Sequence, residues 1–286
     1  MFPAKFAYAA PGSLEEALGL LQDPDAKILA GGHSLLPLMK LRLAQPKLLV
    51  DIGRIPGLNY IRSENGQLAI GALATYRQIQ MAPEVHRQAG VLAECAHEVG
   101  DPQVRARGTL AGALAHADPA GDMPAVVLAL GGSVKAVGTG GERDLPFDGF
   151  FVDMLTTALL EQEIIREVRI NALPAGAGAA YQKFDQPASH YALTGVCAVV
   201  TLNGNTIQSA RVGITGVGPK AYRATRVEQA LQGIPADEES VRAAVQSAAE
   251  GIDVNGDIHA SPEYRAHLAR VLTRRAVMQA AQRARG

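Results

Sequence analysis

The chain has 286 residues, 48% of them hydrophobic and 19% charged, and a formal net charge of −1 at pH 7. This is the composition of an ordinary globular protein with room for two or three packed subdomains. A near-neutral chain lacks the clustered lysines and arginines of a nucleic-acid surface, and no apolar run approaches the roughly 20 residues of a membrane span. Because the N-terminus also lacks the basic-then-apolar order of a signal peptide, we expect a cytoplasmic protein with no membrane span and no nucleic-acid partner.

Few side chains suit a metal ion or a covalent nucleophile. Cys95 and Cys197 stand far apart in apolar segments, so we expect buried reduced thiols rather than a disulfide. An iron–sulfur cluster needs four cysteine ligands, which this chain cannot supply alone. The histidines show no pair at metal-ligand spacing and no serine lies in a Gly-x-Ser-x-Gly frame, which disfavours a metal site and a hydrolase.

The first expected part spans residues 1–57. Ser13-Leu14-Glu15-Glu16 has the pattern of a capping box and predicts a helix with its apolar side turned inward. A strand at Ile28-Leu29 then runs through a glycine turn into a helix from Leu35 to Lys40, and a strand follows from Leu48 to Asp51.

The second part, residues 58–175, is predicted to be an α+β unit. Asn65-Gly66 predicts a hairpin turn. The other elements expected here are a helix around Val91 to Val99, a second glycine turn, a helix from Pro124 to Leu130, and strands from Ser133 to Val137 and from Glu163 to Ile170.

A loop rich in alanine and glycine, Leu173 to Ala180, is the expected linker to the third part, residues 176–286. That part should combine a sheet with helices. We expect strands from Val196 to Leu202 and Ile207 to Val217, and helices from Thr225 to Leu231, Glu238 to Glu250 and Pro262 to Arg283. Apolar residues at helical spacing make the basic stretch near the C-terminus the solvated face of the last helix.

The first glycine turn, Ala30-Gly31-Gly32-His33-Ser34-Leu35, has the features of an anion site. A turn between a strand and a helix can converge its main-chain N–H groups on a phosphate. Glycine permits the main chain to approach closely and to adopt positive φ. The turn has neither the third glycine of a dinucleotide fingerprint nor a Gly-Lys-Ser/Thr sequence, so on its own it is also compatible with an ordinary turn.

A second turn, Gly108-Thr109-Leu110-Ala111-Gly112-Ala113, repeats this chemistry and leads to Asp118-Pro119. The Asp118 carboxylate suits a ribityl or ribose hydroxyl, although Asp-Pro more commonly forms a turn held by an Asx hydrogen bond. Two such turns could grip one extended dinucleotide from both sides.

In these stretches the sequence resembles the FAD-binding medium subunits of the molybdenum hydroxylases, especially the carbon monoxide dehydrogenase flavoproteins, and the flavin domain of xanthine dehydrogenase. The resemblance covers essentially the whole chain, in family order: Leu29 to Lys40, Gly108 to Pro124, Glu163 to Ile165, Tyr181 to Phe184 and Pro187 to Ala192.

The resemblance implies an α+β fold, with a two-subdomain FAD-binding domain of the vanillyl-alcohol-oxidase/PCMH type followed by a small sheet-plus-helices C-terminal domain. It implies non-covalent FAD, and a small iron–sulfur subunit and a large molybdopterin subunit as partners in a dimer of heterotrimers. Iron–sulfur clusters and molybdopterin would lie on the partners only. This chain would then pass electrons from the clusters through FAD to an external acceptor such as a quinone, NAD or dioxygen.

The resemblance and the two turns together give the expected cofactor-binding residues, with no catalytic and no metal-binding residue among them. They are Leu29, Ala30, Gly31, Gly32, His33, Ser34, Leu35, Val99, Gly100, Gly108, Thr109, Gly112, Ala113, Ala117, Asp118, Asp122, Ile164, Ile165, Lys183 and Tyr191.

Two of these residues, Lys183 and Tyr191, also have simpler interpretations, and His33 has an alternative role. By strand alternation Lys183 would face solvent, and Tyr191 would be half-buried packing. The resemblance instead implies that Lys183 lies near the flavin, where a cation would stabilise the anionic reduced form, and that Tyr191 lies beside the isoalloxazine. Some distant flavoproteins attach flavin to a histidine in the first turn, but the resembled subfamily implies a non-covalent role for His33.

The sequence departs from the family pattern in the second turn and after it. Ala111 and Ala113 replace the usual glycine and the usual serine or asparagine, and Gly121-Asp122 replaces Ala-Glu. These changes leave open a structural bridge between subunits that binds flavin weakly. A free-standing flavin oxidase is a third alternative, which would need a substrate pocket with an acid–base residue.

Overall fold

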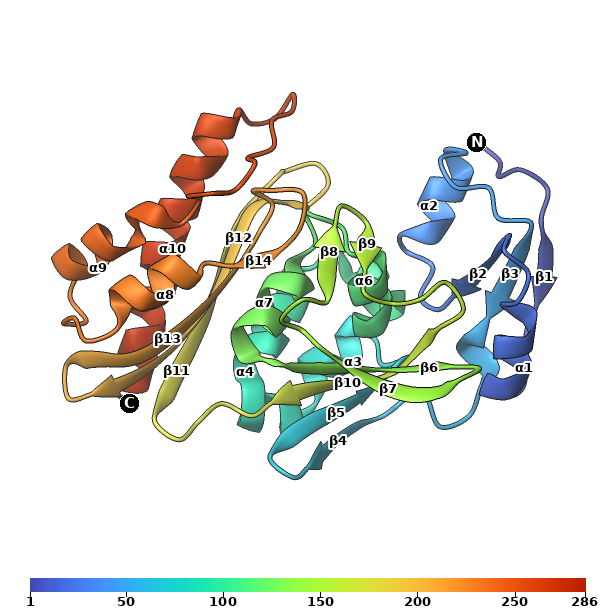
Figure 1. Cartoon of the computed structure of the whole chain (residues 1–286), viewed down its shortest axis with the longest axis horizontal. Helices are drawn as coiled ribbons and strands as arrows, with labels where there is room; N and C mark the ends of the chain where they lie inside the picture. Colours follow the sequence, from blue (N-terminus) through green and yellow to red (C-terminus); the bar gives the residue numbers. More distant parts are fainter.

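The computed structural model describes all 286 residues, which form three successive layers along the long axis of the molecule (Figure 1). The N-terminal layer is a parallel sheet of order β1-β3-β2, with a helix on either side of β2 in the chain. Its elements are β1 (Ala7–Ala9), α1 (Leu14–Leu20), β2 (Ala26–Leu29), α2 (Leu35–Lys40), β3 (Leu48–Asp51) and a short 3-10 helix (Ile52–Arg54).

The middle layer is a five-stranded antiparallel sheet of order β4-β5-β10-β6-β7 with five helices. The hairpin β4 (Ile61–Glu64) and β5 (Gln67–Gly71) turns at Asn65 and Gly66, both at positive φ. The other elements are α3 (Tyr76–Met81), α4 (Pro83–Glu98), α5 (Pro102–Arg107), α6 (Leu110–His116), α7 (Asp122–Leu130), β6 (Gly132–Gly138), β7 (Gly141–Pro146), the small hairpin β8 (Phe151–Asp153) and β9 (Thr156–Thr157), and β10 (Ile164–Asn171).

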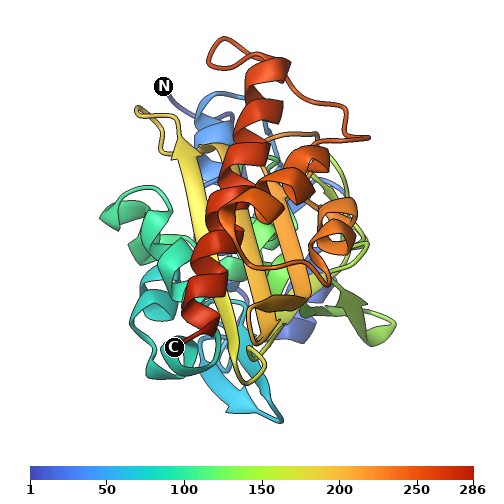
Figure 2. The same cartoon turned by 90° about the vertical axis from the view of Figure 1, so that its left-hand side faces the viewer.

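The C-terminal layer is an antiparallel sheet of order β11-β12-β13-β14. Figure 2 looks onto its outer face, which α10 crosses along its whole length. The elements are β11 (Ala177–Asp185), β12 (Ala192–Asn203), β13 (Thr206–Thr215), β14 (Tyr222–Arg223), α8 (Thr225–Leu231), α9 (Glu238–Ala244), a 3-10 helix (Val245–Ser247) and α10 (Pro262–Ala284).

Helix α7 joins the middle and C-terminal layers. All nine of its residues are buried, because it packs on β12 and β13 on one side and on α4 on the other. Gly213 of β13 permits this close approach, since a Cβ there would collide with the carbonyl oxygen of Ala125. The N-terminal end of α7 is therefore held firmly between the two layers.

The mixed fold expected from the sequence is confirmed, and so are most of its elements. Ser13 caps α1 as predicted, although Glu16 accepts a hydrogen bond from the N–H of Gly12 rather than of Ser13. The helix expected around Val91 to Val99 matches the second half of α4, which is broken at Ala89. Helices α3, α5 and α6 and strands β1, β7, β8, β9 and β14 are additions to the expected set.

The expected linker was too long. Strand β11 already begins at Ala177, so only residues 172–176 connect the layers. The small residues that suggested a flexible loop serve packing instead: a Cβ on Gly178 would collide with the carbonyl oxygen of Ala280 in α10. We propose that the three layers correspond to the parts expected from the sequence, residues 1–57, 58–175 and 176–286. No helix of the structure is long and apolar enough to cross a membrane.

Candidate FAD-binding site

The structure brings the two glycine turns together, although they lie far apart in the sequence. A Cβ on Gly31 would overlap the carbonyl oxygen of Arg107 and lie 2.9 Å from the Cα of Gly108. Main chain thus packs directly against main chain, which only glycine permits at this point. This contact brings the two turns to one place, where they could face one ligand from two sides.

The first turn presents unused hydrogen-bond donors. The main-chain N–H groups of Gly31, Gly32, His33 and Ser34 donate to no acceptor within the chain. Gly32 has a φ of +76°, and Ser34 stands at the N-cap of α2 without forming the cap hydrogen bond. Consecutive free N–H groups before a helix form a cradle for an anion.

The second turn is more rigid, because it begins helix α6 and is attached to α3. The Thr109 hydroxyl accepts a hydrogen bond from the N–H of Gly112 at 3.1 Å and so caps α6. Tyr76 donates its N–H to the carbonyl of Gly108 at 2.9 Å, and a Cβ on Gly108 would overlap the Tyr76 ring. Ala111 is buried in the core, and Ala113 packs against that core. The methyl group of Ala111 therefore lies in the interior, and Ala113 is partly buried.

Asp118 forms the Asx turn that was its simpler interpretation. Its Oδ1 accepts a hydrogen bond from the N–H of Ala120 at 2.9 Å. Its Oδ2 lies 3.7 Å from Nε2 of His116, and the side chain is 28% exposed. Ala117, which precedes it, is buried in the left-handed conformation that ends α6. The turn thus uses one carboxylate oxygen of Asp118, and the other forms no hydrogen bond within the chain.

Lys183 does not face solvent, contrary to its simpler interpretation. Its side chain is only 5% exposed and lies 2.9 Å from Oδ1 of the equally buried Asp122. The hydroxyl of Tyr181 donates to the same carboxylate oxygen at 2.6 Å. Burial raises the pKa of Asp122, whereas Lys183 and Tyr181 oppose that rise. The positive charge of Lys183 is thus largely compensated inside the chain.

The last residue of α4 and the two residues after it accept hydrogen bonds from side-chain cations. Lys183 donates to the carbonyl of Glu98 at 3.0 Å. Arg105 donates to the carbonyls of Val99 and Gly100, each at 3.1 Å. Gly100 has a φ of +48°, a conformation that side chains disfavour. Val99 and Gly100 therefore form a rigid edge beside the ion pair.

Tyr191 lies in the loop between β11 and β12 and is 44% exposed. Burial raises the pKa of its hydroxyl, and the charges of Asp118 and Asp122 raise it further, so the hydroxyl lies in the electrostatic field of both carboxylates. The other expected apolar contacts, Ile164 and Ile165, are buried in two different hydrophobic clusters, which leaves their main chain as the part that could meet a ligand.

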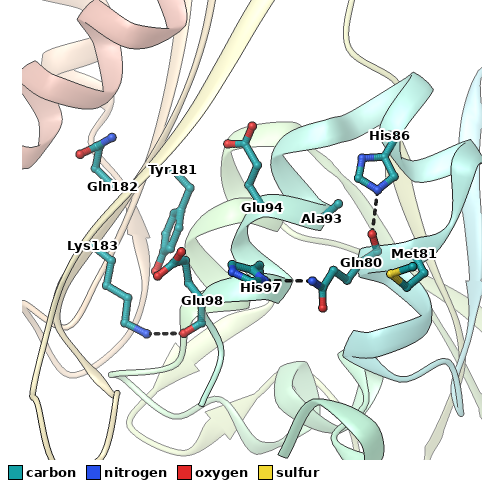
Figure 3. Close-up of a pocket in the computed structure, with 10 residues that line it drawn as sticks. All are labelled: Gln80, Met81, His86, Ala93, Glu94, His97, Glu98, Tyr181, Gln182 and Lys183. Atoms are coloured by element: carbon teal, nitrogen blue, oxygen red, sulfur yellow. Dashed lines mark hydrogen bonds between the residues drawn. The ribbon is translucent and has the colours of Figure 1, made fainter. Parts of the chain in front are cut away.

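A cavity of about 680 Å³ adjoins the ion pair between α3, α4 and β11 (Figure 3). Polar side chains dominate its wall, including His97, whose Nδ1 lies 2.9 Å from Nε2 of Gln80. The lining residues are Gln80, Met81, His86, Ala93, Glu94, His97, Glu98, Tyr181, Gln182 and Lys183.

Sequence reasoning missed three residues that shape the site: Tyr76, Arg107 and Tyr181. Strand alternation could have found Tyr181, because residues two apart on β11 share a face and Lys183 was already a candidate. Tyr76 and Arg107 act through their contacts with the glycines of the two turns. Only the three-dimensional arrangement reveals them.

Two family models match the chain. The FAD binding domain in molybdopterin dehydrogenase matches residues 4–173, and the CO dehydrogenase flavoprotein C-terminal domain matches residues 179–280. The chain therefore belongs to the FAD-binding medium subunits of the molybdenum hydroxylases, which are oxidoreductase subunits.

Individual relatives match over their whole length. The chain is 39% identical to the carbon monoxide dehydrogenase medium chain of Hydrogenophaga pseudoflava, with 97% of each chain covered. It is 38% identical to subunit alpha of the 6-hydroxypseudooxynicotine dehydrogenase complex of Paenarthrobacter nicotinovorans, with 100% of this chain and 97% of the relative covered. A solved structure of carbon monoxide dehydrogenase from Hydrogenophaga pseudoflava superposes with a TM-score of 0.96 at 40% identity, covering 99% of both chains.

Proposed function

We propose that the chain holds one FAD non-covalently, with the pyrophosphate between the two glycine turns. The four free N–H groups from Gly31 to Ser34 support this placement most strongly, because they point to an anionic ligand. The close contact of Gly31 with Arg107 and Gly108 sets the spacing of the two turns. The isoalloxazine would extend toward Asp118, Tyr191 and the edge formed by Val99 and Gly100.

In this role the chain converts between electron carriers of a larger enzyme. Bound FAD can accept electrons one at a time and release them in pairs. The chain's residues would hold the cofactor, with the buried Asp122–Lys183 pair joining α7 to β11 beside it. We propose that a small subunit supplies electrons from iron–sulfur clusters and that a large molybdopterin subunit oxidises the substrate, in a dimer of heterotrimers.

The relatives named as medium chains of multi-subunit dehydrogenases support this assignment of partners. We also propose a cytoplasmic location, which the two buried free thiols favour. A weakly binding structural bridge is the alternative that the departures in the second turn suggested. The burial of Ala111 argues against it, because the added methyl group lies in the core and not at the surface of the turn.

Asp118 should contribute directly to FAD affinity. Replacing it with alanine removes a hydrogen-bond acceptor worth on the order of 1–3 kcal/mol, so the Kd for FAD should rise about ten- to a hundredfold. Asp118→Asn is the matched variant, because its side-chain oxygen can still accept from the N–H of Ala120. Fluorescence titration measures the FAD affinity of the wild type and of both variants. Equal affinity in all three proteins would show that Asp118 only stabilises the turn.

The flavin should be released intact by acid precipitation. His33 is exposed in the first turn, and its expected role is to offer a ring nitrogen to the ligand, with no covalent bond to it. Acid unfolds the chain and abolishes the cradle, so the yellow colour should pass into the supernatant. Colour that stays with the pellet would demonstrate a covalent link and overturn the non-covalent assignment.

A further inference from the structure

Arg265 of α10 is a buried cation that grips main-chain carbonyls. Its Nη1 donates to the carbonyls of Leu193 and Gly216, each at 2.6 Å. Its Nη2 donates to Oδ2 of Asp257 at 2.6 Å. The side chain is 6% exposed, and its Nε has no hydrogen-bond partner within the chain. Burying a guanidinium is costly, and here the contacts fix two points of the sheet.

Those two points hold the loop that carries Asp118. Ala192, next to Leu193, donates its N–H to the carbonyl of Ala120 at 3.3 Å. Gly216 donates its own N–H to the carbonyl of Pro119 at 2.7 Å. The carbonyls that Arg265 binds therefore belong to Gly216 itself and to Leu193, the residue after Ala192.

Thr215 strengthens the same junction. Its hydroxyl lies 2.7 Å from the carbonyl of Pro119 and 2.8 Å from that of Gly121. Tyr191 lies two residues before Leu193, in the loop that leads directly into the β12 end held by Arg265. One arginine of the C-terminal layer is therefore connected, through two strand ends, to both Asp118 and Tyr191.

We propose that Arg265 is a positioning residue for the FAD site. From the C-terminal layer, it holds the loop from Asp118 to Gly121 and Tyr191 in position. This inference rests on the proposed FAD binding between the turns. Arg265 touches no ligand; it acts through the carbonyls of Leu193 and Gly216. The C-terminal layer then contributes to the affinity for FAD by holding the loop in its binding geometry.

Arg283 provides the matched control on the same helix. Its Nη1 donates to the carbonyl of Ala179 at 2.6 Å and to the Glu94 carboxylate at 2.9 Å. It thus makes the same kinds of contact, a main-chain carbonyl and a carboxylate, at the other end of α10. The Arg283 side chain is 38% exposed and that of Arg265 only 6%, so FAD affinity is compared under conditions in which both variants are shown to be fully folded.

The test compares R265K with R283K in the full-length chain, since lysine keeps the charge beside the carboxylate and favours folding. In the FAD-free protein, amide hydrogen exchange at Ala192 and Gly216 should accelerate about tenfold in R265K and stay unchanged in R283K. The Kd for FAD should rise about tenfold in R265K only. The larger change R265M should raise both the exchange rate at Ala192 and Gly216 and the Kd for FAD further.

Each result has a distinct meaning. Unchanged exchange at Ala192 and Gly216 in R265K, or equal effects of the two lysine variants on FAD affinity, would overturn the positioning role. A wild-type chain that fails to bind FAD would instead refute the proposed function. The exchange measurement would still decide, in that case, whether Arg265 holds the loop.

Discussion

Replacing Gly31 with alanine is expected to weaken FAD binding about a hundredfold or more. The new Cβ would overlap the carbonyl oxygen of Arg107 and press on the Cα of Gly108. Both obstacles are main-chain atoms, which cannot rotate away as a side chain would. The two turns must therefore separate, and the N–H groups of the first turn would lose their alignment on the pyrophosphate. Equilibrium titration with FAD measures the effect.

Two controls separate this clash from general damage. Gly19→Ala adds the same methyl group where no atom lies within 4 Å and should leave FAD affinity unchanged. Gly32→Ala and Gly66→Ala form a second pair, because both glycines have a φ of +76° and the two substitutions impose a similar backbone strain. Only the Gly32 variant should lose FAD. A Gly31→Ala protein that is folded and binds FAD like the wild type would show that the turns do not cooperate.

Replacing Lys183 with methionine should destabilise the fold by about 3–5 kcal/mol near neutral pH, because it leaves the buried Asp122 carboxylate without its cation. Burial already holds the pKa of Asp122 above its ordinary value of 3.8, and removing Lys183 raises it further. A carboxyl group with a raised folded-state pKa stabilises the fold at low pH and loses that contribution as pH rises through the folded-state value. The deficit of the variant should therefore be largest at neutral pH and should shrink on acidification.

Urea unfolding of the wild type and of Lys183→Met, carried out from neutral to acidic pH, measures the difference between their free energies of unfolding. We expect this difference to shrink as the pH falls. The double variant Asp122→Asn/Lys183→Met should regain much of the lost stability, because it removes the unpaired charge. A loss of stability that is the same at every pH, or a double variant no more stable than the single one, would show that Lys183 does not stabilise the fold through its ion pair with Asp122.

Local pattern predicted the elements whose signals are strong and short-range. The helix from Leu35 to Lys40, the strand from Leu48 to Asp51 and the hairpin at Asn65-Gly66 appear where expected, because caps, glycine turns and apolar periodicity determine them locally. Strand β7 was missed because its sequence, Gly141 to Pro146, is mostly exposed and charged, and becomes a strand only by pairing with β6.

The close approach of the two turns was predicted from their glycines, whereas the side-chain contacts around the candidate site were not. Glycines in turns indicate a close approach of the main chain, so Gly31, Gly32 and Gly108 could be singled out from the sequence alone. The partner of Lys183 could not, since Asp122 is 61 residues away and meets it only when α7 is packed against β12 and β13. The small residues at the start of β11 suggested a linker, and this prediction was wrong for the same reason. These residues pack against α10, which is distant in the sequence.

One measurement tests the central claim most directly: titration of the FAD-free full-length chain with FAD, followed by reduction with dithionite and addition of an artificial electron acceptor. We expect saturation at one FAD per chain, bleaching of the bound flavin by dithionite and return of its colour with the acceptor. The FAD-loaded chain alone should oxidise no substrate of the assembled enzyme. A folded chain that binds no FAD, or one whose reduced flavin passes no electrons to any acceptor, would contradict its assignment as the electron-converting subunit.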